Sequence, residues 1–241
     1  MPDNPTRAAD GAHQSRHYRR AQQDRGAETR ERLLAAALDA FGRLGFEGAS
    51  TREIARKADA NLAAIVYHFG SKEALHRAVA EHVVRELRQR LGADVDALKD
   101  IGPVASLDKR QVRRMLQRLI ENQIRTLLGE RDAELWSRFI MREQMEPSSA
   151  FDTIYEFMLS SHSVTRQLVA RLFDIDPEGE EVSLRVYALF GQIVIFRVAQ
   201  PMVLRTVGRD TLDEATRQGI LDIVTTNIDR LVGISLADCP P

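Results

Sequence analysis

The chain has 241 residues, 44% hydrophobic and 29% charged, so one large domain or two small ones could each bury a core. The formal net charge of −1 hides an uneven distribution: residues 1–72 hold 12 Lys and Arg against 9 Asp and Glu, and residues 73–241 hold 22 against 26. The single cysteine, Cys239, excludes an intrachain disulfide, and the longest apolar run, Val186 to Phe196, is far shorter than the ~20 residues of a spanning helix. No apolar run follows the N-terminal arginines. These features predict a soluble cytoplasmic protein without a membrane partner.

The first 27 residues are polar, contain two prolines and show no hydrophobic period, which predicts a disordered basic arm over 1–27. Two interpretations of this arm stay open: a tether to the minor groove or backbone of DNA, and a solvated tail. Its basic residues are Arg7, Arg16, Arg19, Arg20 and Arg25. A helix is expected from Thr29 to about Leu44, because apolar residues recur at helical spacing: Leu33, Leu34, Ala37, Leu38, Phe41 and Leu44.

Two short helices joined by a tight turn come next. Ser50, with Glu53 three residues on, predicts a capping box for the first of them. Asp59 and Ala60 form the turn, and Asn61 is a good N-cap for the second helix. In that helix we expect a core-facing set and an outer set: Leu62, Ile65 and Phe69 inside, and Ala63, Ala64, Tyr67 and His68 outside. A helix that packs on a small core and offers its outer face to a groove is typical of a helix-turn-helix.

The remainder of the chain also has helical periodicity. Ser71 caps a fourth helix that continues to about Leu91, and glycines and a proline over 92–108 predict a linker. Further helices are expected at about 109–129, 131–146, 150–173 (broken near His162-Ser163), 179–200 and 212–232. The predicted fold is therefore all-α. A three-helix DNA-binding domain with a helix-turn-helix occupies 28–86, the fourth helix links it to a larger helical domain at 87–233, and 234–241 form a tail.

Residues 28–75 resemble the N-terminal domain of the tetracycline-repressor (TetR) family of bacterial regulators. The matching features are the helix ending at Phe41, the Gly45-Phe46 pair, Ser50-Thr51-Arg52-Glu53-Ile54-Ala55, and Tyr67-His68-Phe69-Gly70-Ser71-Lys72-Glu73-Ala74-Leu75. The rest is similar to a CerR-like C-terminal domain, through Arg142-Glu143 before Pro147-Ser148 and Gly191-Gln192 before Phe196-Arg197. One departure is Asp59 at the turn, where the family usually has glycine. Asp tolerates a left-handed conformation, so the fold should survive.

The resemblance implies that five side chains contact DNA phosphates: Thr51, Arg52, Tyr67, His68 and Lys72. Hydroxyls, an imidazole and two cations near the starts of helices suit that role, although Arg52 and Lys72 would also be ordinary as solvated charges and Tyr67 as a packed side chain. Many relatives have a polar residue or tyrosine where this chain has Val66. Base readout would then rest on few direct contacts, with thymine methyl groups meeting Ala63 or Ala64. Asn61 completes the expected DNA-binding set.

The larger domain is expected to bind a small-molecule effector and to form the dimer. Its aromatic and methionine residues suit a mainly apolar or aromatic effector, although most must simply be core. The candidate ligand-binding residues are Phe139, Arg142, Glu143, Tyr155, His162, Gln192 and Phe196. Helix 179–200 is apolar nearly all round, so it needs a second partner surface. The resemblance implies that the last two long helices pair with their copies, and the expected interface is Ala188, Gly191, Ile195, Ile220, Val224, Ile228 and Leu231.

The resemblance implies a homodimeric transcriptional regulator, a repressor that binds a palindromic operator in double-stranded DNA and is released by the effector; the separate DNA-binding domain and the large apolar C-terminal domain follow from the residues themselves. The rival is a DNA-binding or architectural protein without an effector. An enzyme is disfavoured, because the chain has no phosphate loop, dinucleotide fingerprint or nucleophile elbow. We therefore expect no catalytic residue, no cofactor and no metal site. His68 in particular lacks partners at ligand spacing.

Overall fold

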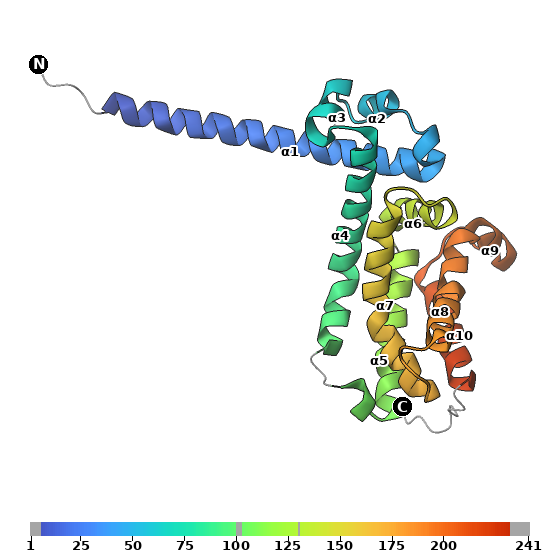
Figure 1. Ribbon diagram of the computed structural model, residues 1–241. Helices are drawn as coiled ribbons and strands as arrows, with labels where there is room; N and C mark the ends of the chain where they lie inside the picture. The colour runs from blue at the N-terminus through green and yellow to red at the C-terminus, as the bar shows by residue number, and fades with distance from the viewer. Residues whose placement is uncertain (1–5, 100–102, 130, 232–241) are drawn as a thin grey trace, which may run out of the picture. The chain divides into compact units, whose positions relative to one another are not determined.

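The structure, a computed structural model, describes residues 6–99, 103–129 and 131–231. Every regular element in these ranges is helical, which confirms the predicted all-α class (Figure 1). The helices are α1 (Thr6–Gly48), α2 (Thr51–Lys57), α3 (Leu62–Phe69), α4 (Lys72–Lys99), α5 (Lys109–Leu128), α6 (Arg131–Met145), α7 (Phe151–Phe173), α8 (Glu180–Val198), α9 (Gln200–Val207) and α10 (Glu214–Leu231), with a short 3₁₀ turn, η1 (Val104–Ser106). The expected tail, 234–241, lies outside the described residues.

The chain divides into two compact units, and the boundary falls between His82 and Val83, inside α4. The expected boundary, after residue 86, lies in the same helix. In the N-terminal unit, α2 packs on α1 and α3 packs on both. The first part of α4 completes the core of this unit, whose largest fully buried side chains are Leu33, Leu34, Phe41, Ile54, Ile65 and Leu75. Burial of these apolar surfaces provides the main stabilisation of the unit.

The start of α1 corrects the first expectation. The segment expected to be a disordered arm is helical from Thr6 onward, and Thr29 lies well inside the helix. Residues 6–28 are rich in alanine, arginine and glutamine, which favour helix, and they extend a helix that packing has already nucleated. Low hydrophobicity in this segment is therefore compatible with a helix, and the structure has a helix where disorder was expected. At the other end, Gly45 has a φ of 73° and kinks the helix, close to the expected end at Leu44.

The turns around α3 follow the predicted chemistry at three of four positions. Asp59 adopts a left-handed φ of 50°, the Asn61 side chain accepts a 2.8 Å hydrogen bond from the backbone N–H of Ala64, and Ser71 accepts one from Ala74 at 3.1 Å. Ser50 stands at the N-cap of α2 with extended backbone, but its side chain makes no capping bond, so the predicted capping box is wrong. Leu62 is also not in the core: it is exposed.

The C-terminal unit is built around α5, which packs against α6, α7, α8 and α10. In Figure 1, α5 and α7 run side by side through this unit, with α8 and α10 next to them. One cluster of buried apolar side chains joins α5, α7, α8 and α10. A buried ion pair adds to it, because the Arg113 guanidinium donates to both oxygens of Asp229, at 2.6 and 2.7 Å. This pair ties α5 to α10, and the bidentate geometry fixes their register.

Three further details differ from the sequence prediction. α7 runs unbroken through His162-Ser163, α4 continues into the expected linker as far as Lys99, and α9 follows α8 after Ala199 as an additional helix. Within the described residues no single helix has the length and apolarity of a membrane span. Among these residues, only α8 and α9 taken together have that length and apolarity, and the two helices meet at a bend of 76°.

We predict that the N-terminal unit loses stability in mild acid because of His76. This imidazole is buried against the rings of Phe41 and Phe46, at 4.5 and 5.1 Å between centroids, and burial lowers its pKa from 6.5 to about 4. As the pH falls through 6.5 the unfolded chain takes up the proton first, so the free energy of unfolding declines until the pH reaches about 4. The expected loss between pH 7 and pH 5 is about 2 kcal/mol.

Urea unfolding at the two pH values measures this loss. His76→Leu should remove the contribution of His76 and leave that of His162, whose pKa burial also lowers to about 4, whereas the control His68→Gln, at a half-buried position outside this cluster, should keep both. An undiminished pH dependence in His76→Leu would contradict the assignment.

Candidate functional site

The outward face of α3 lies in the N-terminal unit and is largely apolar. Ile65 is buried, and three of the larger side chains on the opposite side are well exposed: Leu62 at 43%, Val66 at 61% and Tyr67 at 84%. Ala63 is exposed between them, and Ala64 is half-buried. The face therefore stands clear of the core of its own unit, as a groove-reading helix requires.

The aromatic end of α3 is organised by ring contacts. The Tyr67 ring meets the His68 ring edge-on, with 4.9 Å between centroids, and His68 in turn lies 6.2 Å from the ring of Phe69. Gly26 of α1 lies close to His68, because a Cβ atom at Gly26 would be 4.0 Å from the histidine Cε1, an ordinary van der Waals contact. His68 is thus positioned from two sides, while the Tyr67 hydroxyl remains free to meet a partner in solution.

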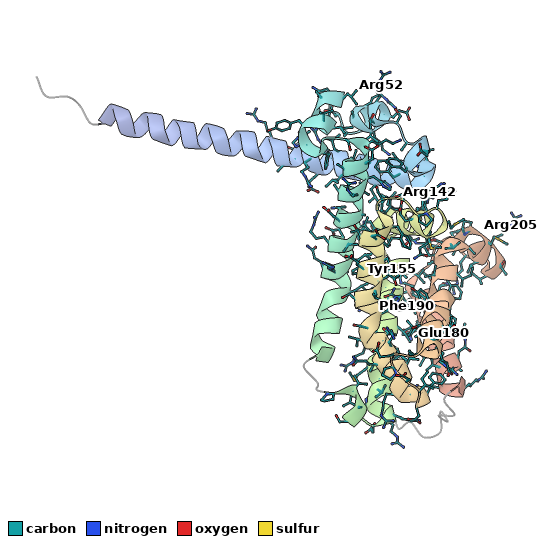
Figure 2. All side chains as sticks on the ribbon, viewed as in Figure 1. Arg52, Arg142, Tyr155, Glu180, Phe190 and Arg205 are labelled. Carbon is teal, nitrogen blue, oxygen red and sulfur yellow. The ribbon has the colours of Figure 1, made fainter. Side chains whose placement is uncertain are left out.

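Two cations flank this face. The Lys72 ammonium lies 4.6 Å from the centroid of the Phe46 ring and donates to the backbone oxygen of Glu47 at 3.4 Å, so it is held in place. Arg52 is exposed and extends outward from α2 (Figure 2). Within the described residues neither cation has a carboxylate at ion-pair distance, in contrast to Arg43 and Lys57, which both pair with Asp39. Thr51, at the start of α2, is half-buried, and Asn61 is exposed while capping α3.

A cavity of about 140 Å³ lies in the C-terminal unit. An apolar cavity of roughly 150 Å³ holds a benzene ring, so this space suits one aromatic ring. Its wall comes from the second part of α4 and from α5, α6, α7 and α8, and the residues of α4 that line it are Val83, Val84, Leu87 and Leu91. Several polar side chains in the wall already bond to their own helices: Ser137 donates to Ala133 and Ser161 to Met158. The cavity therefore offers a mainly apolar surface.

Two lining residues have special chemistry. His162 is buried and stacks on Phe190, with ring centroids 4.2 Å apart, and burial lowers its pKa to about 4, so the imidazole is neutral at pH 7. Arg197 is the one charged side chain among the described lining residues, and its guanidinium donates to Gln200 at 2.6 Å. Burial lowers the pKa of Arg197, although the group remains a cation at neutral pH.

Of the seven expected ligand residues, His162 alone lines this cavity. Arg142 forms a surface ion pair with Glu146 at 2.8 Å, and the buried carboxylate of Glu143 accepts bonds from the backbone and hydroxyl of Ser148. The other four lie elsewhere: Phe139 is buried outside the lining, Tyr155 is exposed and stacks on Phe151, Gln192 accepts a bond from Asn227, and Phe196 packs on the core cluster. Sequence reasoning missed Arg197, because an arginine at the end of an apolar helix also suits a solvated helix end.

The expected dimer residues separate into two groups. On α8, Ala188, Gly191 and Ile195 are exposed, and they continue into the exposed side chains of Leu184, Tyr187 and Val198. On α10, by contrast, Ile220, Val224 and Ile228 are buried in the unit's own core, so they cannot present a surface to a partner, and that part of the expectation is wrong. The exposed apolar residue of α10 is Ile223, and the side chain of Leu231 lies outside the described set.

With both sites described, the chain can be compared with known proteins. Residues 33–79 match the bacterial regulatory proteins of the tetR family, and residues 112–234 match the C-terminal domain of the HTH-type transcriptional dual regulator CecR. The chain is 32% identical over 209 residues to that dual regulator from Shigella flexneri, which spans 86% of this chain and 93% of the relative. The chain belongs to the TetR family. Its C-terminal domain is of the CecR type, which is the type expected above under the name CerR.

Solved structures agree on the TetR-family fold. HlyIIR, a hemolysin II transcriptional regulator, superposes with a TM-score of 0.55 at 17% identity and covers 83% of this chain and 98% of its own. A transcriptional regulator from Rhodococcus sp. Rha1 gives a TM-score of 0.52 at 20% identity and covers 83% of this chain and 96% of its own. At these identities the likeness shows the fold alone. The matched relatives are transcriptional regulators, so the protein is a DNA-binding regulator with a helix-turn-helix at α2 and α3.

Proposed function

We propose that this TetR-family regulator binds a palindromic operator as a homodimer, represses the adjoining promoter and is released by a small-molecule effector. The observation that carries the proposal is the course of α4. This helix begins three residues after the end of α3, at Lys72, and its later residues, from Val83 to Leu91, line the cavity. We call α2 and α3 together the reading head. A ligand that moves the cavity wall therefore acts on α4, the helix that continues from the reading head.

Contact with DNA is supported by the surfaces of α2, α3 and the start of α4. In a helix-turn-helix the second helix enters the major groove and the first crosses the backbone. On this basis Thr51, Arg52, Tyr67, His68 and Lys72 contact phosphates, with Asn61, Ala63 and Ala64 near the bases. The exposed cations and the Tyr67 hydroxyl suit phosphate oxygens, which position the protein without reading sequence.

Lys72→Ala should weaken operator binding without unfolding the protein. Loss of one phosphate contact per subunit, or two per dimer, makes the dependence of log K on log salt less steep by ~1.8. The control Lys57→Ala removes a lysine of the same unit that is paired with Asp39, so the salt slope should stay at the wild-type value. Fluorescence anisotropy at several salt concentrations gives both slopes. A wild-type slope and affinity for Lys72→Ala would remove this residue from the interface.

The apolar face of α8 supports the homodimer. Leu184, Tyr187, Ile195 and Val198 are exposed along one side of the helix, and Ile223 of α10 is exposed as well. Large exposed apolar patches on a soluble protein mark interaction surfaces. If two chains join through the same patch, a two-fold axis relates them. Such a dimer can place its two reading heads one helical turn of DNA apart, and a palindromic operator has the same two-fold symmetry.

Gly191→Trp should prevent this dimer while leaving the monomer folded. A side chain at Gly191 meets nothing within 4 Å in its own chain, so the indole has room in the monomer and blocks only a partner. Leu159→Trp, at an exposed leucine of α7 away from this face, is the control and should stay dimeric. Sedimentation at micromolar concentration distinguishes the two. A dimeric Gly191→Trp protein, or a monomeric wild type, would place the interface elsewhere.

The cavity supports the effector. Its apolar wall and the His162–Phe190 stack suit an aromatic ring, and Arg197 suits an anionic or strongly accepting handle. The effector is thus a compact, mainly apolar molecule with one such handle. In this proposal the anchoring cation is Arg197, and not Arg142 of the candidate set expected from the sequence.

Benzoate is a direct probe of this site. It should raise the melting temperature and weaken operator binding by roughly 5- to 150-fold, the usual range of allosteric coupling. Benzylamine, with the opposite charge, should do neither. Arg197→Met should abolish the benzoate response, whereas Arg142→Met, which disturbs only the surface pair with Glu146, should retain it. If no aromatic ligand of either charge alters both the melting temperature and operator affinity, the effector-independent alternative is favoured.

The name of the Shigella flexneri relative, a dual regulator, makes activation at some promoters the second candidate role.

A further inference from the structure

The exposed arc of α3 has an unusual composition for a helix that reads bases. Because an α-helix turns by about 100° per residue, Leu62, Ala63, Val66 and Tyr67 form one continuous arc, and all four are exposed. We call these four residues the reading arc. Val66 and Ala63 lie at its centre, opposite the buried Ile65. The arc contains no amide, guanidinium, ammonium or carboxylate group, and its one polar atom is the hydroxyl of Tyr67 at the edge.

This composition excludes the usual hydrogen-bonded readout at the centre of the arc. Guanine is read in the major groove by donors of arginine or lysine, adenine by the paired donor and acceptor of an amide, and cytosine by a carboxylate. None of these groups belongs to Ala63 or Val66. Thymine is the base whose major-groove edge carries an apolar feature, its C5-methyl group, and that feature is met by apolar side chains.

The polar residues nearest the arc are already engaged in other positions. Asn61 stands at the N-cap of α3, where its side-chain oxygen accepts the 2.8 Å bond from Ala64, so this amide is held at the helix start and not on the arc. Lys72 is held over Phe46 and at Glu47, after the end of α3. Neither Asn61 nor Lys72 therefore places its polar group at the centre of the arc.

We propose that the reading arc recognises thymine methyl groups, so that each operator half-site presents T·A pairs to Ala63 and Val66. The proposal rests on the operator binding proposed above and names the chemistry of that partner. DNA is the occupant that the surroundings favour, because residues 50–77 carry five Lys and Arg against three Asp and Glu. An apolar strip edged by cations is complementary to a groove whose walls are phosphates and whose floor carries methyl groups.

The first experiment replaces thymine by deoxyuridine, which removes the C5-methyl group and leaves every hydrogen-bonding atom in place. The full-length protein selects a high-affinity duplex from random-sequence DNA, and each thymine of that duplex is then replaced in turn. At the contacted positions the affinity should fall about fourfold per methyl, the equivalent of ~0.8 kcal/mol for one buried methyl-sized group. Replacement of thymines outside the protected region should have no effect.

The second experiment assigns the methyl groups to the arc. In Val66→Ala the deoxyuridine penalty at one position of each half-site should disappear, because the side chain that met the methyl is gone. Leu44→Ala is the matched control: Leu44 is an exposed leucine of α1 in the same unit but outside α3, and its replacement should leave the penalty unchanged. Val66→Ala in the protein and deoxyuridine for thymine in the DNA form a double-mutant cycle. This cycle separates the energy of the contact from any general loss of affinity.

The outcomes separate this inference from the proposed function. If no sequence is enriched from the random pool, the operator-binding proposal itself fails. If a sequence is enriched but deoxyuridine binds as tightly as thymine at every position, operator binding stands and methyl readout is overturned. An equal penalty in wild type, Leu62→Ala and Val66→Ala also overturns it. If Val66→Ala changes self-association and not operator affinity, the arc is a contact between copies and the inference is wrong.

Discussion

The continuity of α4 is the constraint on which the rest of the molecule depends. Leu75 and Val79 are completely buried in the N-terminal unit, and Val83 is completely buried where the helix begins to line the cavity. One helix therefore contributes side chains to the cores of both units. The left-handed Gly70 and the Ser71 cap start this helix immediately after α3, so the reading head continues directly into the cavity wall.

The polar groups of the interior divide into those that fix the fold and those that leave room for a ligand. Arg113 and Asp229 form an ion pair that holds α5 on α10, and neither residue lines the cavity. Breaking such a pair leaves an uncompensated buried charge and is strongly destabilising. His76 and His162 are both buried and neutral at pH 7, yet His76 lies beside Phe41 in the core of the N-terminal unit, whereas His162 stacks on Phe190 in the cavity wall. The same residue type thus lies in a filled core in one unit and in the wall of a cavity in the other.

The helix-turn-helix could be predicted from sequence because its signals are local. Asp59, Asn61 and Ser71 each act on their own turn, and the structure places all three as predicted. Leu62 was wrongly expected in the core. Helical spacing predicts the side of α3 on which a residue lies, but not how far along the helix the core extends. The family and the C-terminal type also followed from short strings of residues, and the comparisons confirm them.

The C-terminal sites could not be predicted in the same way, because they depend on which helix faces which. The stripe of Ile220, Val224 and Ile228 has the same spacing whether it faces its own core or a partner, and packing against α5 and α8 decides for the core. The positions of the expected ligand residues relative to the cavity could not be predicted for a similar reason. Arg142 and Glu143 lie on an amphipathic helix at positions that periodicity cannot distinguish from a cavity wall, and their actual partners, Glu146 and Ser148, come from the following residues.

The central claim is that an unbroken α4 couples the cavity to the reading head, and Glu81→Gly tests it most directly. Glu81 is exposed on α4, one residue before the end of the N-terminal unit, and glycine weakens a helix interior by about 1 kcal/mol relative to alanine. Operator affinity is measured with and without a ligand that stabilises the protein, in wild type, Glu81→Gly and the control Glu81→Ala. The account predicts that all three bind ligand and operator, that wild type and Glu81→Ala respond equally, and that the response of Glu81→Gly is smaller. An undiminished response in Glu81→Gly would contradict transmission through α4.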